Sequence, residues 1–312
     1  MKNVNILSLS FGSNRTVHPG WEGALNIIKE NINGTEDLVL LPETCLGGDI
    51  VNEPGDAFLS GISDIAIKNK AYILASVYRK VDDKYRANSA ILHDRNGEIA
   101  FTYDKMYPWV GEFNDNIPLV MPGSRAVYAD TDFGRVSAAI CFDANFPDLW
   151  QDISDLDVDL VLFTSAYSAG SQLCAHALNH HYAIVTATHK PDFAVYDING
   201  TEVTYTRCET FNRPDNVLVS RTRIDLDKVI CHFNYNRDKV FKMLKDYAGK
   251  IEIEHEWDRE EWFVIRSSTP DINVRAVCKE YSIESLREYK RRARKIIEEK
   301  RGFPPIRPIR GC

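Results

Sequence analysis

The segment RVSAAICFDANFPDLW, residues 135–150, joins an apolar, strand-like stretch to a helix through a very short turn. The apolar stretch ends at Cys141, and Pro147 suits the first turn of a helix, where no N–H donor is needed. A cysteine at such a turn is expected to expose its sulfur above the edge of a sheet. The nearby amides and the helix N-terminus favour negative charge on a thiolate or on a developing oxyanion. Taken alone, however, this cysteine is more simply explained as a small buried residue that closes a core strand.

The sequence around this segment alternates between strand patterns and helix patterns. Strand-like apolar runs occur at 4–10, 38–41, 71–78, 160–165 and 183–188. Helical stretches occur at 23–32, 57–68 and 171–182. Asn-Gly pairs at 96–97 and 199–200, and a further turn at 131–134, predict hairpins. Alternating strands and helices predict parallel pairing, and the hairpins predict mixed sheets, so residues 1 to about 235 are expected to form one α/β domain.

The length and composition are those of a globular chain with a large core. The 312 residues are 44% hydrophobic and 27% charged, which excludes a disordered chain. No apolar run reaches the roughly 18 residues typical of a membrane span, so no membrane partner is expected. The start MKNVNILSLSFG predicts a first strand rather than a signal peptide. The net charge of −7 argues against a nucleic-acid partner.

The seven cysteines are scattered along the chain and form no CxxC pair. This arrangement predicts neither a disulfide framework nor a zinc site. Free thiols suit a reducing compartment, and the cytoplasm is the simplest localisation.

The C-terminal part differs from the rest in charge. Residues 279–312 carry 11 basic and five acidic side chains, a net charge of +6, whereas the remainder carries 27 and 40, a net charge of −13. An apolar stripe, a capping box formed by Ser285 and Glu288, and a stop at Gly302 predict a basic amphipathic helix. We therefore divide the chain into a main domain over 1–278 and a basic helix and tail over 279–312. The helix is expected to pack on its own body or on a sister subunit, rather than on nucleic acid or membrane.

Two further strand ends carry residues that suit catalysis. In LVLLPETCLGGD, residues 38–49, Glu43 follows an apolar strand, where burial raises the pKa of a carboxyl and makes it a general base. In FTYDKMYPWVGEFND, residues 101–115, Lys105 lies among aromatic residues and is suited to stabilising an anionic intermediate. The simpler alternatives are a solvated loop glutamate and a lysine that covers apolar neighbours.

Together these strand ends resemble the nitrilase superfamily of carbon–nitrogen hydrolases over residues 1 to about 235. The motifs are LPE at Glu43, YDK at Lys105 and ICFDANFPD at Cys141. KMYPW with Glu112, and the run from Asn145 to Pro147, are most similar to the aliphatic amidase and formamidase branch. The resemblance implies a four-layer α-β-β-α sandwich with two mixed sheets. It also implies a homodimer or higher homo-oligomer and neither a metal nor an organic cofactor.

The resemblance also implies a role for each site residue. Glu43 is the general base, Cys141 attacks the substrate carbon, and Lys105 with the backbone N–H of Phe142 stabilises the tetrahedral intermediate. Ammonia or an amine leaves, and water hydrolyses the thioester that remains. Glu112 matches the second glutamate of the family and orients Lys105 or acts as a further acid, although Asp115 competes for this role. A thiol with a pKa of about 8.5 is mostly protonated at neutral pH and needs such a base.

Four residues are candidates for substrate binding because they follow Lys105 or the strand at 160–165. They are Tyr107, Trp109, Ser165 and Tyr167. The alternative is that they pack in the core. The expected substrate is a small amide or N-carbamoyl compound, with a nitrile as the second choice. His189 and Lys190 depart from the family pattern and are expected to alter the pocket rim.

Three other interpretations compete with this one. His176 and His180 share a helical face, but the glutamate of an HExxH metal site is missing between them. A papain-like Cys–His enzyme needs a histidine beside Cys141, for which His189 and His232 are available. A non-catalytic binding or scaffold protein on the same fold would be expected to lack a catalytic residue, and all three are present.

Overall fold

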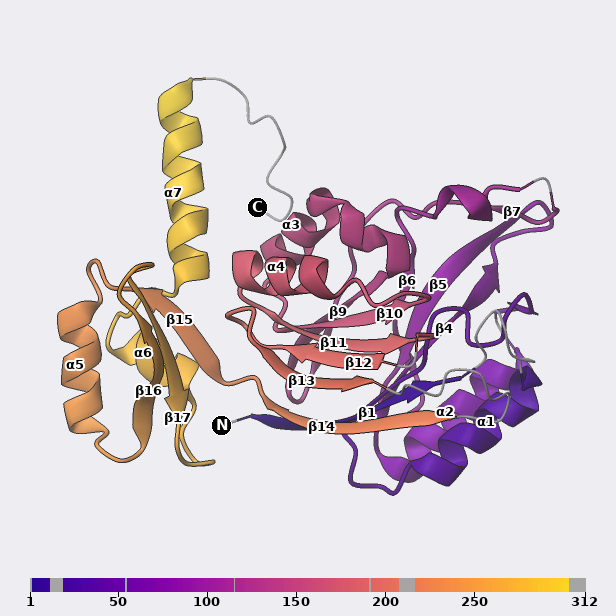
Figure 1. Cartoon of the computed structure of the whole chain (residues 1–312), viewed down its shortest axis with the longest axis horizontal. Coiled ribbons are helices and arrows are strands. Elements are labelled where there is room, and N and C mark those ends of the chain that lie inside the picture. Colours follow the sequence, from indigo (N-terminus) through magenta and orange to yellow (C-terminus); the bar gives the residue numbers. More distant parts are fainter. Residues whose placement is uncertain are drawn as a thin grey trace.

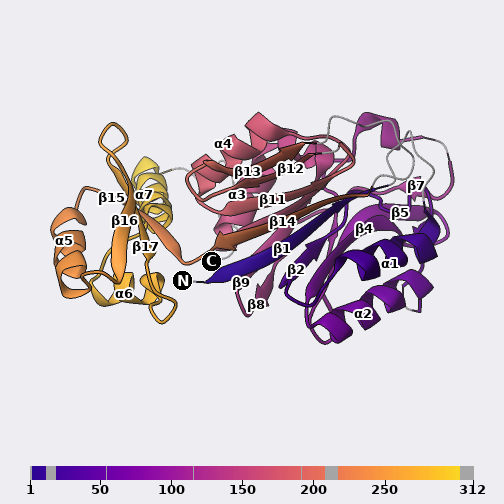
Figure 2. The ribbon, with the colours of Figure 1, turned by 60° about the horizontal axis from the view of Figure 1, so that its bottom comes forward.

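The computed structural model describes residues 2–11, 19–53, 55–114, 116–190, 192–207 and 217–302. Two large mixed sheets face each other, and a pair of helices covers the outer face of each (Figures 1 and 2). α1 (Gly20–Asn31) and α2 (Ala57–Asn69) cover the first sheet, and α3 (Pro147–Asp155) and α4 (Gly170–His180) cover the second. This confirms the predicted α-β-β-α sandwich.

The first sheet combines parallel strands at its centre with hairpins at one side. Its path is β14 (Leu218–Asp225), β1 (Asn3–Ser10), β2 (Leu38–Leu40), β4 (Tyr72–Lys80), β5 (Tyr85–His93) and β6 (Ile99–Asp104). β3 (Ile50–Val51) pairs with β4, and β7 (Leu119–Val120) pairs with β5. β1, β2 and β4 run parallel, whereas β4, β5 and β6 are antiparallel, and the predicted Asn-Gly turn joins β5 to β6.

The second sheet has the same design. Its order is β13 (Glu202–Arg207), β12 (Asp192–Tyr196), β11 (Ala183–Thr188), β10 (Leu160–Ser165), β9 (Gly134–Ile140) and β8 (Ala129–Thr131). β9, β10 and β11 are parallel. β8–β9 and β12–β13 are antiparallel hairpins at the two predicted turns, and β11–β12 is a further antiparallel pair.

Alternating side chains on each strand explain the apolar runs in the sequence. Leu38 and Leu40 of β2 face the core between the sheets, while Val39 faces the layer of α1 and α2. Both faces of the central strands are therefore buried, so their sequences are continuously apolar rather than alternating.

The chain beyond residue 227 builds a third, smaller sheet that the sequence did not predict. β15 (Lys228–His232), β17 (Trp262–Ser267) and β16 (Ile251–Trp257) pair in this order with one another. α5 (Arg237–Asp246) and α6 (Val274–Glu280) pack on them around a core that contains Val240, Phe263 and Val277. Figure 1 shows this unit beside the sandwich. The division of the chain at 278/279 stays a prediction.

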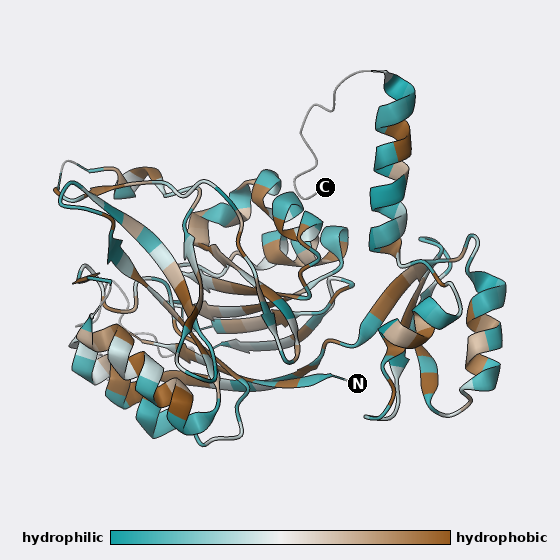
Figure 3. Cartoon of the chain, turned by 180° about the vertical axis from the view of Figure 1, so that it is seen from behind, coloured by the Kyte–Doolittle hydropathy of each residue, from teal (hydrophilic) through white to brown (hydrophobic). Residues whose placement is uncertain are grey.

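The basic helix α7 (Leu286–Arg301) begins at the predicted capping box. The side chains of Ser285 and Glu288 each accept a hydrogen bond from the backbone N–H of the other residue. Its basic side contacts the sandwich. Arg291 forms an ion pair with Asp157 at 2.7 Å, and Lys290 donates to the carbonyl of Asn179 near the C-terminal end of α4. Cations near a helix C-terminus are stabilised by the helix dipole. The apolar stripe of α7, with Ile296 and Ile297, lies on another side and is largely exposed (Figure 3).

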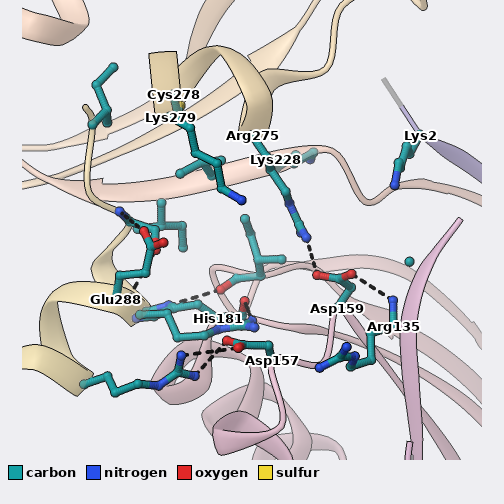
Figure 4. Close-up of a pocket in the computed structure, with 18 of the residues that line it drawn as sticks. Lys2, Arg135, Asp157, Asp159, His181, Lys228, Arg275, Cys278, Lys279 and Glu288 are labelled. Atoms are coloured by element: carbon teal, nitrogen blue, oxygen red, sulfur yellow. Dashed lines mark hydrogen bonds and ion pairs between the residues drawn. The ribbon is translucent and has the colours of Figure 1, made fainter. Parts of the chain in front are cut away.

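A cavity of about 560 Å³ separates the third sheet and α7 from the sandwich (Figure 4). It is rich in charged side chains, but most of its cations are already paired. Arg275 forms an ion pair with Asp159, and Lys228 is held by Asp197 and Glu254. We therefore interpret this cavity as part of the interface between the sandwich and the C-terminal part of the chain, rather than as a ligand site. Among the described helices, none is both long and apolar enough to cross a lipid bilayer.

Candidate active site

The ends of three strands from the two facing sheets bring a carboxylate, an ammonium group and a thiol together. Glu43 follows β2, Lys105 follows β6, and Cys141 follows β9. Lys105 Nζ lies 2.8 Å from Glu43 Oε1, and both side chains are buried. The Cys141 thiol is close enough to interact with the same carboxylate and to lower its pKa. The three groups that the sequence singled out separately therefore form one contact network.

Glu43 is held in place by neighbours on both of its oxygens. Asn88 Nδ2 donates to Oε1 at 2.9 Å, and the backbone N–H of Ala166 donates to Oε2 at 2.8 Å. Burial acts to raise the pKa of Glu43, but the adjacent Lys105 ammonium and these hydrogen bonds outweigh burial, and the pKa falls below its ordinary value. The raised pKa expected from burial alone was wrong, because the sequence did not show how close Lys105 lies. Glu43 is ionised at neutral pH and is able to accept a proton.

Lys105 is shared by two glutamates. Its Nζ lies 2.6 Å from Glu112 Oε1 as well as 2.8 Å from Glu43. Burial acts to lower the pKa of Lys105, but Glu43 and the other acidic neighbours raise it above its ordinary value, so the ammonium keeps its charge. Glu112 ends a short 3-10 turn, η1 (Val110–Glu112), and also accepts from Asn88 Nδ2 at 3.0 Å. Asp115, the competing acid, lies outside the described residues.

The Cys141 turn has the strained backbone of a tight strand-to-helix connection. Cys141 begins the 3-10 segment η2 (Cys141–Asn145) with a φ of 49°, which is unusual for a residue with a side chain. Pro147 follows at the start of α3, as predicted. Burial and the Glu43 carboxylate raise the pKa of the thiol to about 12, more than Lys105 lowers it. The turn therefore does not favour a resting thiolate, and attack needs a base.

Asp143 fixes this turn and was missed by the sequence analysis. Its buried carboxylate accepts from the backbone N–H of Ile140 at 2.8 Å, from the Tyr103 hydroxyl at 2.7 Å and from the backbone N–H of Tyr107 at 2.9 Å. Burial raises the pKa of Asp143 to about 7. The signal in the sequence was a charged residue inside the largely apolar ICFDANF motif. Asp143 links the cysteine turn of one sheet to the lysine segment of the other.

The predicted substrate-binding residues differ in position. Trp109 is 57% exposed, and its ring lies over Gly111, where a Cβ atom would come within 2.0 Å of the ring. Tyr107 stacks on Phe146 with ring centroids 3.9 Å apart. Ser165 is fully buried, accepts from the backbone N–H of Tyr167 at 2.9 Å and is close enough to the Cys141 thiol to lower its pKa.

Tyr167 and Phe142 lie on the two sides of the same turn. The Tyr167 hydroxyl lies 3.4 Å from Asn145 Nδ2 and 3.2 Å from Gln172 Oε1. Phe142 directly follows Cys141 in η2, and its carbonyl accepts from Asn145 Nδ2 at 3.1 Å. Tyr167 and Phe142 thus belong to the polar cluster around Asn145, beside Cys141.

The histidines that suggested other chemistry have other surroundings. His176 Nε2 contacts the carbonyl of Ala144 at 2.9 Å, and its ring stacks on Trp150. His189 contacts the backbone carbonyls of Phe11 and Glu43. His232 belongs to the third sheet and stacks on Tyr289. Within the described ranges, no cluster of three or more His, Cys, Asp or Glu side chains is arranged to hold a metal ion.

Comparison with known proteins gives matches over the sandwich. The family model described as carbon-nitrogen hydrolase matches residues 10–196. A formamidase of Bradyrhizobium sp. (strain ORS 278) is 28% identical over 148 residues, which is 44% of this chain and 42% of the relative. A deaminated glutathione amidase of Dictyostelium discoideum is 27% identical over 114 residues, or 33% of this chain and 39% of the relative. The chain thus spans about two fifths of the length of these curated relatives.

Solved structures share the fold at low sequence identity. A cysteine-to-alanine mutant of the Nesterenkonia AN1 amidase, from the nitrilase superfamily, has a TM-score of 0.60 and 17% identity, and the match covers 78% of this chain and 97% of that one. A carbon-nitrogen hydrolase from Helicobacter pylori G27 has a TM-score of 0.57 and 16% identity, over 72% and 90% of the two chains.

Proposed function

This chain belongs to the carbon-nitrogen hydrolase family, as its motifs predicted, and we propose that it hydrolyses a small amide or N-carbamoyl compound through a cysteine thioester. The observation that carries this proposal is the position of Lys105, whose ammonium group contacts both Glu43 and Glu112 while the Cys141 thiol interacts with Glu43. A base, a cation and a nucleophile thus meet at one point. The similarity to a formamidase supports the amidase- and formamidase-like branch.

Formation of the thioester begins with proton transfer from Cys141 to Glu43. Because the resting thiol has a pKa of about 12, the proton leaves as the sulfur attacks the amide carbon. The carbonyl oxygen takes up the electron pair of the broken π bond. Lys105 and the backbone N–H of Phe142 stabilise this oxyanion, which is where a fixed positive charge in a dry site has most effect.

Collapse of the tetrahedral intermediate breaks the C–N bond. The leaving nitrogen takes the proton that Glu43 received and departs as ammonia or an amine. Water then enters, gives a proton to Glu43 and attacks the thioester carbon. The C–S bond breaks, and the sulfur recovers a proton from Glu43, so the carboxylate ends the cycle as it began.

Glu112 and Asn88 act as positioning residues in this scheme. Glu112 accepts from Lys105 and from the backbone N–H of Trp109 at 2.8 Å, which anchors it to the loop. Asn88 donates to both glutamates from one nitrogen atom. The two carboxylates therefore stay close together around a single ammonium group, which offsets their mutual repulsion.

Ammonia release from a panel of small amides, N-carbamoyl amino acids and nitriles tests the proposal. The wild-type protein is expected to act on an amide or carbamoyl compound and to form a hydroxamate when hydroxylamine replaces water. Cys141→Ala should lose both reactions. Cys174→Ala removes another partly exposed thiol, in α4, and should retain them. Inertness of the wild type toward the whole panel, or equal activity of Cys141→Ala, would overturn the proposal.

The assembly and compartment are also proposals. The five cysteines that the structure describes are all free, which supports a reducing compartment such as the cytoplasm. Membership of the family supports a homodimer or higher homo-oligomer. Light scattering of the purified full chain should give a mass of at least twice 35.5 kDa, and a monomer at micromolar concentration would contradict this.

A further inference from the structure

Arg86 lies on the site-facing side of the sheet that carries Asn88. Side chains alternate along a strand, so Arg86 and Asn88 of β5 leave the sheet on the same face, about 7 Å apart along the strand. Asn88 contacts both glutamates of the catalytic network. Arg86 is therefore the next side chain after Asn88 on the face of β5 that forms the site.

The Arg86 guanidinium lies over the ring of Tyr78 in the neighbouring strand. Its central carbon lies 4.4 Å from the centroid of the Tyr78 ring. The Tyr78 hydroxyl in turn contacts Glu112 Oε2 at 3.4 Å. Stacking on an aromatic ring fixes the plane of a guanidinium and leaves its edge free to donate hydrogen bonds. A chain of contacts thus runs from Arg86 through Tyr78 to the second glutamate.

The positive charge of Arg86 has no carboxylate partner. Among the described residues, no Asp or Glu oxygen lies within 4 Å of its nitrogens, and its buried Nε–H donates to no acceptor. Arg79 in β4 also has a buried Nε without an acceptor, but its charge is paired, because its Nη2 donates to both oxygens of Asp104. A buried N–H without an acceptor is unfavourable, so a ligand that supplies an acceptor is favoured here.

Arg86 is the cation of this face that is available to an anion. Lys105 is already matched by the two carboxylates of Glu43 and Glu112, whereas Arg86 has no carboxylate partner among the described residues. An arginine placed beyond them and not paired with either suits a second, external carboxylate. The planar guanidinium edge binds a carboxylate through two parallel hydrogen bonds, a geometry that a lysine does not reproduce.

We infer that Arg86 binds a carboxylate of the substrate, and that the preferred substrates are amides or N-carbamoyl compounds of short carboxylic acids. This inference rests on the proposed function and adds the substrate class. The scissile carbonyl lies at Cys141, and the carboxylate of the same molecule lies at Arg86. The monoamides of short dicarboxylic acids have these two groups at opposite ends of a short carbon chain.

Matched substrate pairs test the inference. Succinamate is compared with butyramide, and glutaramate with valeramide, because each pair differs by one carboxylate. The wild type is expected to have a kcat/KM at least ten-fold higher for one of the carboxylates than for its neutral partner. Arg86→Gln should lower the kcat/KM for that carboxylate by about 10- to 100-fold, the effect of losing charged hydrogen bonds, and lower that of the neutral amide much less. Arg86→Lys should lie between the two.

Lys80→Gln is the matched control. Lys80 is directly opposite Arg86 in the β4–β5 pair and is an equal charge, but it is already paired with Asp83 at 2.6 Å. Its loss should leave the ratio of the two kcat/KM values unchanged. A similar change in both variants, or an equal loss on charged and neutral amides in Arg86→Gln, would show a general electrostatic or structural effect and would overturn the inference.

A binding measurement separates this inference from the proposed function. Calorimetric titration of glutaramate and succinamate into Cys141→Ala requires no turnover. Binding that weakens about ten-fold or more when Arg86→Gln is added supports the inference even if the wild type hydrolyses no amide, in which case only the proposed function fails. Equal binding with and without the Arg86 substitution overturns the inference, whatever the hydrolysis assays give.

Discussion

Asp143 accepts a hydrogen bond from the backbone N–H of Tyr107 across 2.9 Å and thereby joins the cysteine turn of one sheet to the lysine segment of the other. The same carboxylate accepts from Ile140 within its own turn. The distance between Cys141 and Lys105 is therefore set by one buried side chain rather than by sheet packing alone. This relationship makes Asp143 the first residue to test.

Asp143→Asn should weaken both stability and catalysis. Both oxygens of the Asp143 carboxylate accept hydrogen bonds, but an amide has only one acceptor oxygen. In the variant, the NH₂ group would therefore face an N–H or O–H donor and could not accept its hydrogen bond. We expect the free energy of unfolding to fall by about 1–3 kcal/mol, and kcat/KM for a good amide to fall at least ten-fold. Chemical denaturation and ammonia-release kinetics measure the two effects. Asp148→Asn, at an exposed site in the first turn of α3, is the control, and equal behaviour of the two variants would contradict the assignment.

Asn88→Asp should disable the site through charge rather than through shape. The substitution is almost isosteric, but it replaces the N–H donor shared by Glu43 and Glu112 with a third carboxylate. Like charges in a buried site raise one another's pKa, so Glu43 would hold a proton at neutral pH and stop acting as a base. We expect a loss of about 100-fold or more in kcat/KM at pH 7. Full activity of Asn88→Asp would show that the asparagine does not hold the two glutamates.

Glu43 should contribute stability that depends on pH. Because its pKa is lowered in the folded chain, its contribution is complete above the unfolded value of about 4.5 and is lost as the pH falls through the lower folded value. The difference in free energy of unfolding between wild type and Glu43→Gln should therefore shrink between pH 5 and pH 3. Urea titrations at several pH values measure it. A difference that grows as the pH falls would mean that burial, not Lys105, controls this carboxyl.

The Cys141 thiol should become more reactive when Glu43 loses its charge. Burial and then Glu43 raise the pKa of the thiol, whereas Lys105 lowers it, so Glu43→Gln should bring the pKa down from about 12. The rate of reaction with a neutral disulfide reagent at pH 7 is expected to rise, although amide hydrolysis is lost because the base is gone. Subtracting the rate of Cys141→Ala isolates this thiol. A slower reaction in Glu43→Gln would indicate that Glu43 is needed to activate the sulfur toward any reagent.

Arg287 should matter more to stability than Arg292 on the same helix. Arg287 donates to the backbone carbonyls of Val158 and His181 in the sandwich, whereas Arg292 pairs with the nearby Glu284 and lies over the ring of Tyr289. Arg287→Ala leaves carbonyls of buried residues without a partner and is expected to cost about 1–3 kcal/mol. Arg292→Ala breaks a largely exposed ion pair and should cost less than about 1 kcal/mol. Calorimetric unfolding of both variants compares them, and equal costs would argue against the docking of α7 on the sandwich.

Local patterns in the sequence predicted the elements and the identity of the central site residues. The strand that ends at Cys141, the Asn-Gly hairpins, Pro147 at the start of α3 and the Ser285 capping box all depend on backbone periodicity and turn chemistry over a few residues. The motifs at Glu43, Lys105 and Cys141 then indicated the family. The four-layer arrangement was predicted from the resemblance to that family.

The tertiary structure decided how these residues affect one another. The register between β4, β5 and β6 places Asn88 in contact with Glu43 and Glu112, and it places Arg86 next to Asn88 on the same face of β5. No local sequence pattern specifies which residues become neighbours in this way. The same is true of Asp143, which spans two sheets, and of the third sheet, whose strands are short and mixed in polarity. The pKa of Glu43 and that of Cys141 both depend on charges more than 35 residues away in the chain, because electrostatic energy follows distance in space and not distance along the sequence.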